Sequence, residues 1–420
     1  MKIVIMGSGV IGVTSAYFLA RMGHEVTVLD KNSEAANDCS FANGGQLSYS
    51  HIEPFSSKTS ITLVLKAFFS INSFLKIKDL RDKNFLKWFF EFIKNYNEKT
   101  SQKNTKKLFI LGKYSKATLS WILKEEGGLK FDYSQKGILH FFRNHKLFAK
   151  AKKQAELQKS FGDKIEICDA KRCVELEPTL TKLSDKKKLV GGIFHQEDES
   201  GNCFKFTQSL AKICQEKYGV VFEYNSEIKN ILTNHKKITG INTLKKVFTA
   251  DKYIYALGAA GIGLLNGIKI DSKIYPIKGY SLSIATNEEF LAPKIGLTDP
   301  ENKIVYSRIG NIFRAAGVIE FCKFNEDKNI KLLKFLEQKI KASFSNFGDI
   351  AKTQEWQGFR PFRPNSIPLI CKVEKYGNLF LNTGHGHLGW TMSCGSAKVL
   401  SDIISEKNPK DFEFLKEEKI

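Results

Sequence analysis

Three glycines near the start of the chain have the spacing that binds a pyrophosphate. They form the pattern G-x-G-x-x-G between a short apolar run, which predicts a buried strand, and a helix that extends to Met22. Gly7 permits a tight turn, Gly9 lets the backbone approach the phosphates, and Gly12 lets the helix pack closely on the strand. The free N–H groups at the start of the helix then face the anion. The residues predicted to form this unit are Ile3, Val4, Ile5, Met6, Gly7, Ser8, Gly9, Val10, Ile11, Gly12, Val13, Thr14, Ser15, Ala16 and Tyr17.

A carboxylate follows at the distance that completes a dinucleotide site. The apolar run Val26–Leu29 predicts a second strand, and it ends in Asp30, 18 residues after Gly12. A carboxylate at this position accepts hydrogen bonds from the ribose hydroxyls of an adenosine, and it disfavours the 2′-phosphate of NADP. Lys31 follows directly and is included in the site. The whole unit predicts a bound adenine dinucleotide, and its N-terminal position favours FAD over NAD, although the motif alone does not decide.

Two segments in the middle of the chain could approach the same ligand. Asn43, Gly44, Gly45 and Gln46 suggest close backbone approach to a planar group, with an ordinary surface turn as the alternative. The stretch Lys252–Gly261 predicts a strand that runs into a small-residue turn. Two further cofactor contacts are predicted in and before this stretch, at Gly258 and Ile228.

The C-terminal part of the chain holds a second glycine-rich junction between a strand and a helix. The partial positive charge at the start of that helix would stabilise a flavin ring that becomes anionic on reduction. The residues predicted to contact such a ring are Gly384, His385, Gly386, Leu388, Gly389, Trp390 and Thr391.

The elements that position these residues belong to a soluble globular protein. A chain of 420 residues with 42% apolar and 26% charged residues is long enough for two or three domains. The net charge of +21 comes with only 8 arginines among 65 basic residues, and no basic-aromatic motif is present. This pattern argues against nucleic-acid binding and favours a lysine-rich solvated surface, with attraction to an anionic membrane as the alternative. The dispersed cysteines and histidines predict no metal site.

One apolar stretch needs a separate interpretation. Ile61–Phe74 is too short for a membrane span and contains Lys66. It could form a core helix, which we favour, or a patch that lies on lipid.

Taken in order, these segments resemble the FAD-dependent D-amino-acid oxidase superfamily, and within it the small, flavin-bearing subunits of bacterial D-amino-acid dehydrogenases. The resemblance extends over almost the whole chain, and its first segment, Ile3–Tyr17, is shared with many flavoproteins. The most specific segments are Tyr275–Leu282 and Asn382–Ser396. The full set is Ile3–Tyr17, Ser40–Gln46, Asn202–Ala211, Tyr275–Leu282, Gly358–Pro361 and Asn382–Ser396.

The resemblance implies an α/β fold with two domains. A discontinuous Rossmann-type FAD-binding domain would comprise residues 1–55, 160–262 and 355–405. A second, α+β substrate (cap) domain, built on a mixed or antiparallel sheet, would comprise residues 56–159 and 263–354. Residues 406–420 would form a C-terminal tail.

The resemblance also implies an activity. A D-amino acid such as D-alanine would pass a hydride from Cα to flavin N5 of a non-covalent FAD, and water would hydrolyse the imine to a 2-oxo acid and ammonia. The electrons would pass to a quinone or another respiratory acceptor. The protein would then be cytoplasmic, as a peripheral protein on the inner face of the cell membrane. Oligomeric state and partner subunits stay open.

Three residues are predicted to contact the substrate. The resemblance implies that Arg360 pairs with the substrate carboxylate, with a structural ion pair as the alternative. Tyr280 and Tyr306 are candidates for a phenol hydrogen bond to the same carboxylate, although core packing would also explain them. Four of the eight arginines fall within 56 residues, which favours an anion site there: Arg308, Arg314, Arg360 and Arg363.

Two other functions remain compatible with the sequence. The first is an oxygen-using amine oxidase of the same fold, of the glycine, sarcosine or D-proline type. The second is a flavoprotein that relays electrons in a complex and turns over no amino acid of its own.

Overall fold

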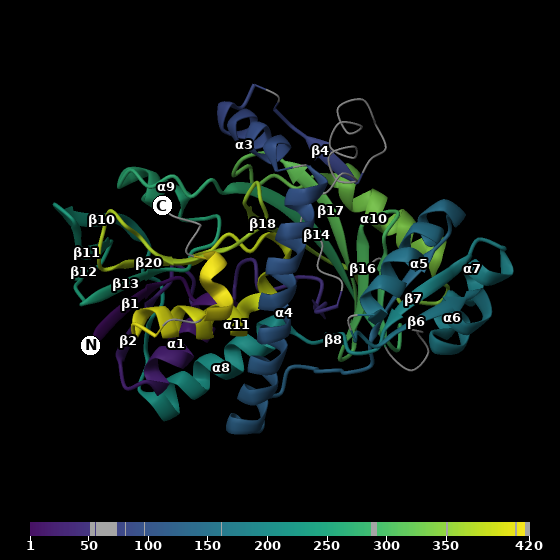
Figure 1. Cartoon of the computed structure of the whole chain (residues 1–420), viewed down its shortest axis with the longest axis horizontal. Helices are drawn as coiled ribbons and strands as arrows, with labels where there is room; N and C mark the ends of the chain where they lie inside the picture. The colour runs from purple at the N-terminus through teal and green to yellow at the C-terminus, as the bar shows by residue number, and fades with distance from the viewer. Residues whose placement is uncertain are drawn as a thin grey trace.

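The computed structural model describes residues 1–50, 55, 74–79, 81–95, 97–160, 162–286, 292–349, 352–407 and 410–415, which build two sheets (Figure 1). The first sheet has the strand order β19-β20-β13-β1-β2-β9 and is parallel except for β19, which runs antiparallel to β20. Its strands are β1 (Lys2–Met6), β2 (Glu25–Leu29), β9 (Val221–Glu223), β13 (Lys252–Tyr255), β19 (Leu369–Lys372) and β20 (Leu379–Thr383).

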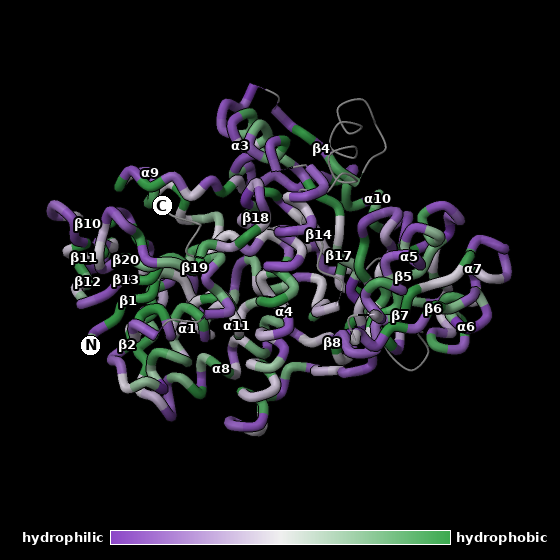
Figure 2. Tube along the Cα trace, viewed as in Figure 1, coloured by the Kyte–Doolittle hydropathy of each residue, from purple (hydrophilic) through white to green (hydrophobic). Residues whose placement is uncertain are grey.

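Helices cover one face of the first sheet, and α1 lies at their centre between α8 and α11 (Figure 1). The long helix α4 packs against α11. The tube of Figure 2 is hydrophobic along β1, β13 and α1, as expected for parallel strands that are buried on both faces. A small antiparallel sheet, β10-β11-β12, shares a core with the other face. These elements are α1 (Val10–Arg21), α4 (Glu98–Glu126), α8 (Cys203–Tyr218), α11 (Gly389–Ile404), β10 (Ile228–Asn234), β11 (Lys237–Thr243) and β12 (Val247–Phe248).

The second sheet is mixed and has the order β18-β14-β17-β16-β15-β5-β7-β6, with β4 also paired to β17. Its strands are β4 (Leu75–Ile77), β5 (Ile138–Phe142), β6 (Ile165–Asp169), β7 (Gly191–His195), β14 (Tyr275–Ala285), β15 (Gly296–Asp299), β16 (Ile304–Ile309), β17 (Ile312–Phe321) and β18 (Gln354–Phe362). The elements around it are α3 (Lys83–Lys94), α5 (His145–Ser160), α6 (Ala170–Leu176), α7 (Thr181–Asp185), α10 (Ile330–Ser343) and the 3-10 turn η1 (Pro178–Leu180).

Short elements connect the two sheets. β3 (Gln46–Leu47) pairs with β8 (Glu199–Ser200), so the segment after β2 is fixed beside the segment before α8. The remaining short elements are α9 (Ile262–Gly267) and the 3-10 turns η3 (Gly386–Leu388) and η4 (Lys410–Leu415).

The fold class predicted from the sequence is confirmed, since a parallel sheet with helices is joined to a mixed sheet. The domain boundaries stay a prediction, and the sheets divide the chain differently at several places. β18 lies in the second sheet although the sequence grouped residues 355–405 with the dinucleotide-binding segments. β6 and β7 lie in the second sheet although the sequence grouped residues 160–262 with the dinucleotide-binding segments, and α4 packs on α11 although it falls within 56–159. Local patterns predict a strand or a helix, but they do not specify which sheet it joins.

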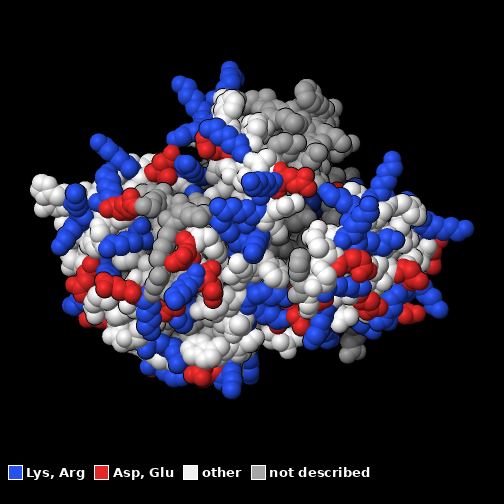
Figure 3. Space-filling model, viewed as in Figure 1, with Lys and Arg blue, Asp and Glu red and all other residues white. Residues whose placement is uncertain are grey.

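The surface shows lysines and arginines over most of the viewed face, mixed with acidic residues (Figure 3). Among the described residues, no helix is both long enough and apolar enough to cross a membrane. Of the apolar stretch Ile61–Phe74, residues 61–73 lie outside the described residues, so its interpretation stays a prediction.

A buried carboxylate at the end of α4 ties that helix to the first sheet's helices. Glu126, whose side chain is 2% exposed, accepts hydrogen bonds from Tyr17 (2.7 Å), Tyr218 (2.6 Å) and Arg21 (3.0 Å) and pairs with Lys217 at 2.8 Å. Burial alone would raise the pKa of Glu126, but the hydrogen bonds from Lys217, Tyr218 and Tyr17 outweigh burial and lower it to about 2. The ionised carboxylate therefore stabilises the contact between α4, α1 and α8.

We expect Glu126→Gln to lower the free energy of unfolding at pH 7 by about 2 kcal/mol. Because the folded-state pKa lies below the ordinary 4.5, this stabilisation is complete above pH 4.5 and is lost as the pH falls toward 2. Denaturation curves of the variant and the wild type at several pH values should therefore converge in acid. Glu125→Gln is the matched control, because Glu125 is the neighbouring carboxylate, is 40% exposed and pairs with Arg21 at 3.2 Å. An equal loss in both variants, or a difference that persists in acid, would contradict this assignment.

Candidate active site

A cavity of about 1160 Å³ lies between the two sheets and is lined by residues from both ends of the chain. Its walls include Gly9 and Asp30 from the N-terminal unit, Gly258 after β13, Arg360 from β18 and Thr391 from α11. The carboxyl ends of β1 and β13 open toward it, which is where ligands bind in open α/β sheets. Segments separated by more than 350 residues therefore form a single site.

The first end of the cavity is built by the N-terminal glycines. A Cβ at Gly12 would lie 1.9 Å from the carbonyl oxygen of Gly7, and Gly7 itself has a φ of +104°, so both positions require glycine. The Asp30 carboxylate accepts hydrogen bonds from the Ser8 N–H (2.7 Å), the Ser8 hydroxyl (2.8 Å) and the Asn32 N–H (2.9 Å). These bonds fix the carboxylate at the end of β2, where it can accept hydrogen bonds from ribose.

The opposite end of the cavity is built by the junction between β20 and α11. Gly384 and Gly386 adopt φ values of +82° and +56°, which turn the chain sharply before the helix begins. His385 is buried between them, and its Nε2 lies 2.9 Å from the Ser396 hydroxyl. Burial lowers the pKa of His385 to about 3, so the imidazole is neutral. The residue before α11 is Leu388, and within the described part of the chain no N-cap side chain accepts a hydrogen bond from the first turn of this helix. The N–H groups of that turn and the positive end of the helix dipole can therefore face a ligand.

Arg360 is the cavity residue best suited to bind an anion. Its guanidinium lies against the backbone of Gly279, where a Cβ would be 2.5 Å from the arginine Cζ. Among the described residues, no carboxylate and no hydrogen-bond acceptor pairs with this half-buried guanidinium. Burial lowers the pKa of Arg360, because its charge is partly withdrawn from water without compensation. A bound carboxylate would supply the missing partner.

The other arginines of the predicted cluster have partners within the protein. Arg314 donates to the Ser283 hydroxyl (2.9 Å) and to the carbonyl oxygen of Asn43 (3.2 Å). Arg363 donates to backbone oxygens, including that of Ile367 at 2.7 Å. Arg308 is exposed and donates to Gly310.

Tyr280 and Tyr306 do not lie in the cavity, so the structure does not place them as substrate contacts. Each lies on the face of the second sheet that packs against α10, which we call the helix face; the opposite face, which carries Arg360, is the cavity face. Ser281 and Ser307, one residue further along each strand, instead donate to the backbone of the loop at residues 42–44. Side chains alternate along a strand, so the phenols point away from the cavity.

The core packing that the sequence offered as an alternative accounts for both tyrosines. Tyr280 donates a 2.6 Å hydrogen bond to Glu320, and Tyr306 packs edge-on against Phe344 with ring centroids 4.8 Å apart.

Most of the predicted cofactor contacts line the cavity, and the others support it from behind. The lining residues are Gly7, Gly9, Val10, Ile11, Asp30, Lys31, Asn43, Gly44, Gly45, Gln46, Ile228, Gly258, His385, Gly386, Leu388, Gly389, Trp390 and Thr391. The residues that do not line it are Ile3, Val4, Ile5, Met6, Ser8, Gly12, Val13, Thr14, Ser15, Ala16, Tyr17 and Gly384. They form β1, the buried side of α1 and the turn before α11, so they shape the site without facing the ligand.

Three residues that the sequence did not single out take part in the site. The Ser40 hydroxyl accepts a hydrogen bond from the Val10 N–H at 3.0 Å, and Cys39 donates to the carbonyl of Phe359, beside Arg360. Gly279 provides the open surface on which the guanidinium lies. A glycine inside a strand pattern indicates the close approach of another group, so the position of Gly279 could have been noticed from the sequence.

These residues fit an adenine dinucleotide that carries a flavin. A carboxylate held for ribose, a glycine turn and helix start for pyrophosphate, and an open helix start at α11 follow one another along one cavity. Among the described residues, no group of three or more His, Cys, Asp or Glu side chains could hold a metal ion.

Comparison with known proteins agrees with this fit. Residues 2–403 match the model of the family described as DAO, FAD dependent oxidoreductase. The chain is 37% identical to a D-amino acid dehydrogenase of Azorhizobium caulinodans over 410 residues, 98% of this chain and 97% of the relative. It is also 37% identical to a D-amino acid dehydrogenase of Dechloromonas aromatica over 422 residues, 99% of this chain and 100% of the relative.

Solved structures share the fold at lower identity. Glycine oxidase from Bacillus cereus superposes with a TM-score of 0.74 at 20% identity and covers 98% of this chain and 97% of its own. L-proline dehydrogenase from P. horikoshii superposes with a TM-score of 0.73 at 17% identity and covers 100% and 99%. The resemblance stated from the sequence and the predicted cofactor, FAD, are both confirmed. The chain belongs to the DAO family of FAD-dependent oxidoreductases.

Proposed function

We propose that this enzyme oxidises D-amino acids of the D-alanine type to 2-oxo acids and ammonia, and passes the electrons to a quinone or another respiratory acceptor. The similarity to curated D-amino acid dehydrogenases over nearly the whole chain supports the substrate class. The single observation that carries the proposal is the guanidinium of Arg360, which has no acceptor within the described part of the chain and lies in a cavity whose remaining walls fit FAD.

Different residues of this chain would bind different parts of the cofactor. Asp30 would hold the adenosine ribose, Gly9 and Ile11 would lie against the pyrophosphate, and the start of α11 at Gly389 would face the redox ring. When bound, FAD supplies the two-electron acceptor for oxidation of the substrate Cα–N bond.

Arg360 would bind and orient the substrate. A bidentate pair with the carboxylate fixes the amino acid in one orientation, and orientation is a large part of what such a site contributes. An amino acid bound as the neutral amine needs no strong base to lose its α-hydrogen as hydride. His385 would not serve as a base, because it is buried against Ser396.

The proposed electron acceptor implies where in the cell the protein works. A membrane quinone would require the protein to work at the cytoplasmic face of the cell membrane as a peripheral protein. The net charge of +21 supports this, because anionic lipid attracts basic surfaces.

The decisive test is anaerobic reduction of the purified holoenzyme. We expect D-alanine to bleach the flavin absorbance while L-alanine leaves it unchanged, and the reduced enzyme to be reoxidised faster by a soluble quinone analogue than by oxygen. Bleaching with rapid peroxide formation would indicate an oxygen-using amine oxidase. Failure of any D-amino acid or secondary amine to bleach the flavin would favour the electron-relay alternative and refute the proposal.

We expect Arg360→Ala to raise KM for D-alanine at least about 100-fold, which corresponds to roughly 2.7 kcal/mol of lost carboxylate binding. The flavin spectrum should not change, because the arginine is assigned to substrate rather than to cofactor. Steady-state kinetics with a dye acceptor measure the effect. Arg308→Ala is the matched control, since Arg308 is exposed and does not line the cavity. Near-normal kinetics in Arg360→Ala would remove this residue from the site.

We expect Gly279→Ala to raise KM about 10-fold with little loss of stability. The added methyl would occupy the position of the Arg360 guanidinium, and that flexible side chain can move aside more easily than the backbone can. Thermal denaturation and kinetics measured together separate the two effects. Gly267→Ala is the control, because a Cβ there meets no atom within 4 Å. An unchanged KM would show that the guanidinium does not need its position over Gly279.

A further inference from the structure

A fully buried lysine lies on the helix face of the second sheet, behind the substrate site. Lys278 on β14 is 0% exposed, and its ammonium donates a 2.7 Å hydrogen bond to the carbonyl oxygen of Asp327. The ammonium also lies 3.4 Å from a carboxylate oxygen of Glu320 and 5.7 Å from the ring centre of Phe359. A charge that is removed from water in this way is retained only when partners compensate it.

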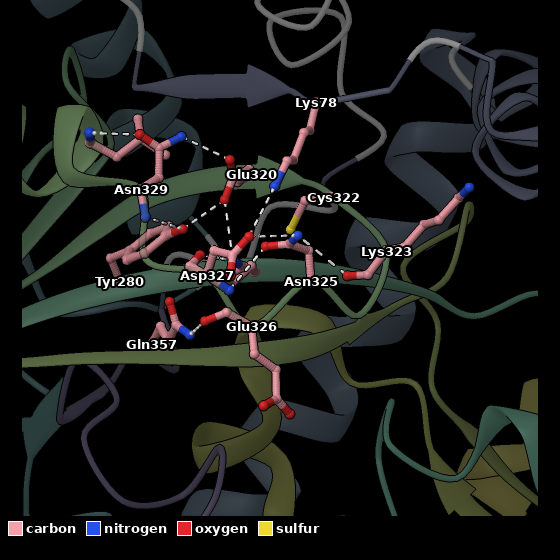
Figure 4. A network of polar contacts seen from close by, with 12 residues as sticks. Lys78, Tyr280, Glu320, Cys322, Lys323, Asn325, Glu326, Asp327, Asn329 and Gln357 are labelled. Atoms are coloured by element: carbon pink, nitrogen blue, oxygen red, sulfur yellow. Dashed lines mark hydrogen bonds and ion pairs between the residues drawn. The ribbon is translucent and has the colours of Figure 1, made fainter.

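Glu320 completes a network on the same face. Its two carboxylate oxygens accept hydrogen bonds from the Tyr280 hydroxyl (2.6 Å) and the Asn329 side-chain amide (2.7 Å). Burial and the Glu320 carboxylate raise the pKa of Tyr280, so the phenol stays a donor. Figure 4 shows Tyr280 and Asn329 pointing toward Glu320, while the carboxylate of Glu326 points away from them.

A β-bulge decides which face carries Glu320. Along β17, Ile319 pairs with Gly279 but Gly317 pairs with Tyr280, so Val318 is an extra residue without a partner. Val318 adopts a φ of +42°, a left-handed conformation that is strained for a β-branched side chain. Bulges of this kind re-aim the side chains that follow them, and they concentrate beside active sites.

The alternative register would bring Glu320 to the substrate site. With the bulge, Glu320 lies directly opposite Lys278 on the helix face. If β17 paired with β14 without the bulge, so that Val318 lay opposite Gly279, Glu320 would lie opposite Ile277. Ile277 is itself opposite Arg360 on the cavity face. The backbones would then be about 10 Å apart, two strand spacings, which is within the combined reach of a glutamate and an arginine. An internal ion pair would occupy the guanidinium and compete with the substrate carboxylate.

We propose that Lys278 is a positioning residue for substrate binding, which holds Glu320 on the helix face and so keeps Arg360 free for the substrate carboxylate. This inference rests on the proposed function, because it assumes that Arg360 binds that carboxylate. It gives the strained bulge a purpose: the lysine compensates the buried carboxylate on the one face where that carboxylate cannot reach the arginine.

The test compares three variants of the holoenzyme: Lys278→Met, Glu320→Gln and the double variant. We expect Lys278→Met to raise both KM for D-alanine and the Kd for propionate at least 10-fold, with a smaller change in kcat. Propionate is a carboxylate of the same length without the amine, and its binding is followed by the flavin absorbance. Glu320→Gln should stay within threefold of the wild type, since it leaves no carboxylate to compete. The double variant should recover most of the lost affinity.

The control is Glu177→Gln, a buried carboxylate bonded to Thr179 and to the backbone of Lys294, outside the cavity lining. It should lower Tm without changing the Kd for propionate. Unchanged affinity in Lys278→Met, or a tenfold loss in Glu320→Gln, would overturn the inference. If Lys278→Met does not fold, Glu320→Gln and the double variant still decide between the two results. Failure of the proposed function is distinguishable, because the wild-type flavin would then not be reduced by D-amino acids.

Discussion

The rest of the site depends on one constraint: the Arg360 guanidinium faces the cavity and has no acceptor among the residues that the structure describes. An arginine that faces a cavity will pair with any carboxylate within reach, so the surrounding structure must keep such groups away. Here the backbone of Gly279 lies beneath the guanidinium, and Lys278 and Glu320 on the neighbouring strands are turned to the helix face. Alternation along β14, β16 and β17 therefore matters as much as the arginine itself.

The cofactor end depends on a different constraint, the close approach of two helix starts to one ligand. α1 and α11 pack side by side on the first sheet, so their N-termini open toward the same cavity. Both starts follow glycines that no other residue could replace without a clash or strain, such as Gly7 and Gly384. A parallel sheet is the natural support, because its strands all end at one edge.

The sequence predicted the cofactor end better than the substrate end. The spacing of Gly7, Gly9, Gly12 and Asp30 is a local pattern, and its geometry follows from the chain within one supersecondary unit. Tyr280 and Tyr306 lie outside the cavity lining, and the sequence did not show this because a strand pattern does not reveal which face meets the cavity. A one-residue bulge such as the one at Val318 moves every later side chain of the strand to the opposite face of the sheet. The periodicity of the sequence did not indicate this bulge. The sheet to which β6 and β7 belong was likewise a matter of tertiary packing.

The pairing of β1 has a consequence for biosynthesis. β1 lies between β2, which follows at once, and β13, whose first residue is Lys252. At about 5–20 residues per second, a ribosome needs roughly 12–50 seconds to produce that partner. Throughout this interval the β1 edge of the nascent βαβ unit is unpaired, made of apolar residues, and open to chaperones and to other nascent chains. A strand at the centre of the mature sheet thus spends most of translation as an open edge.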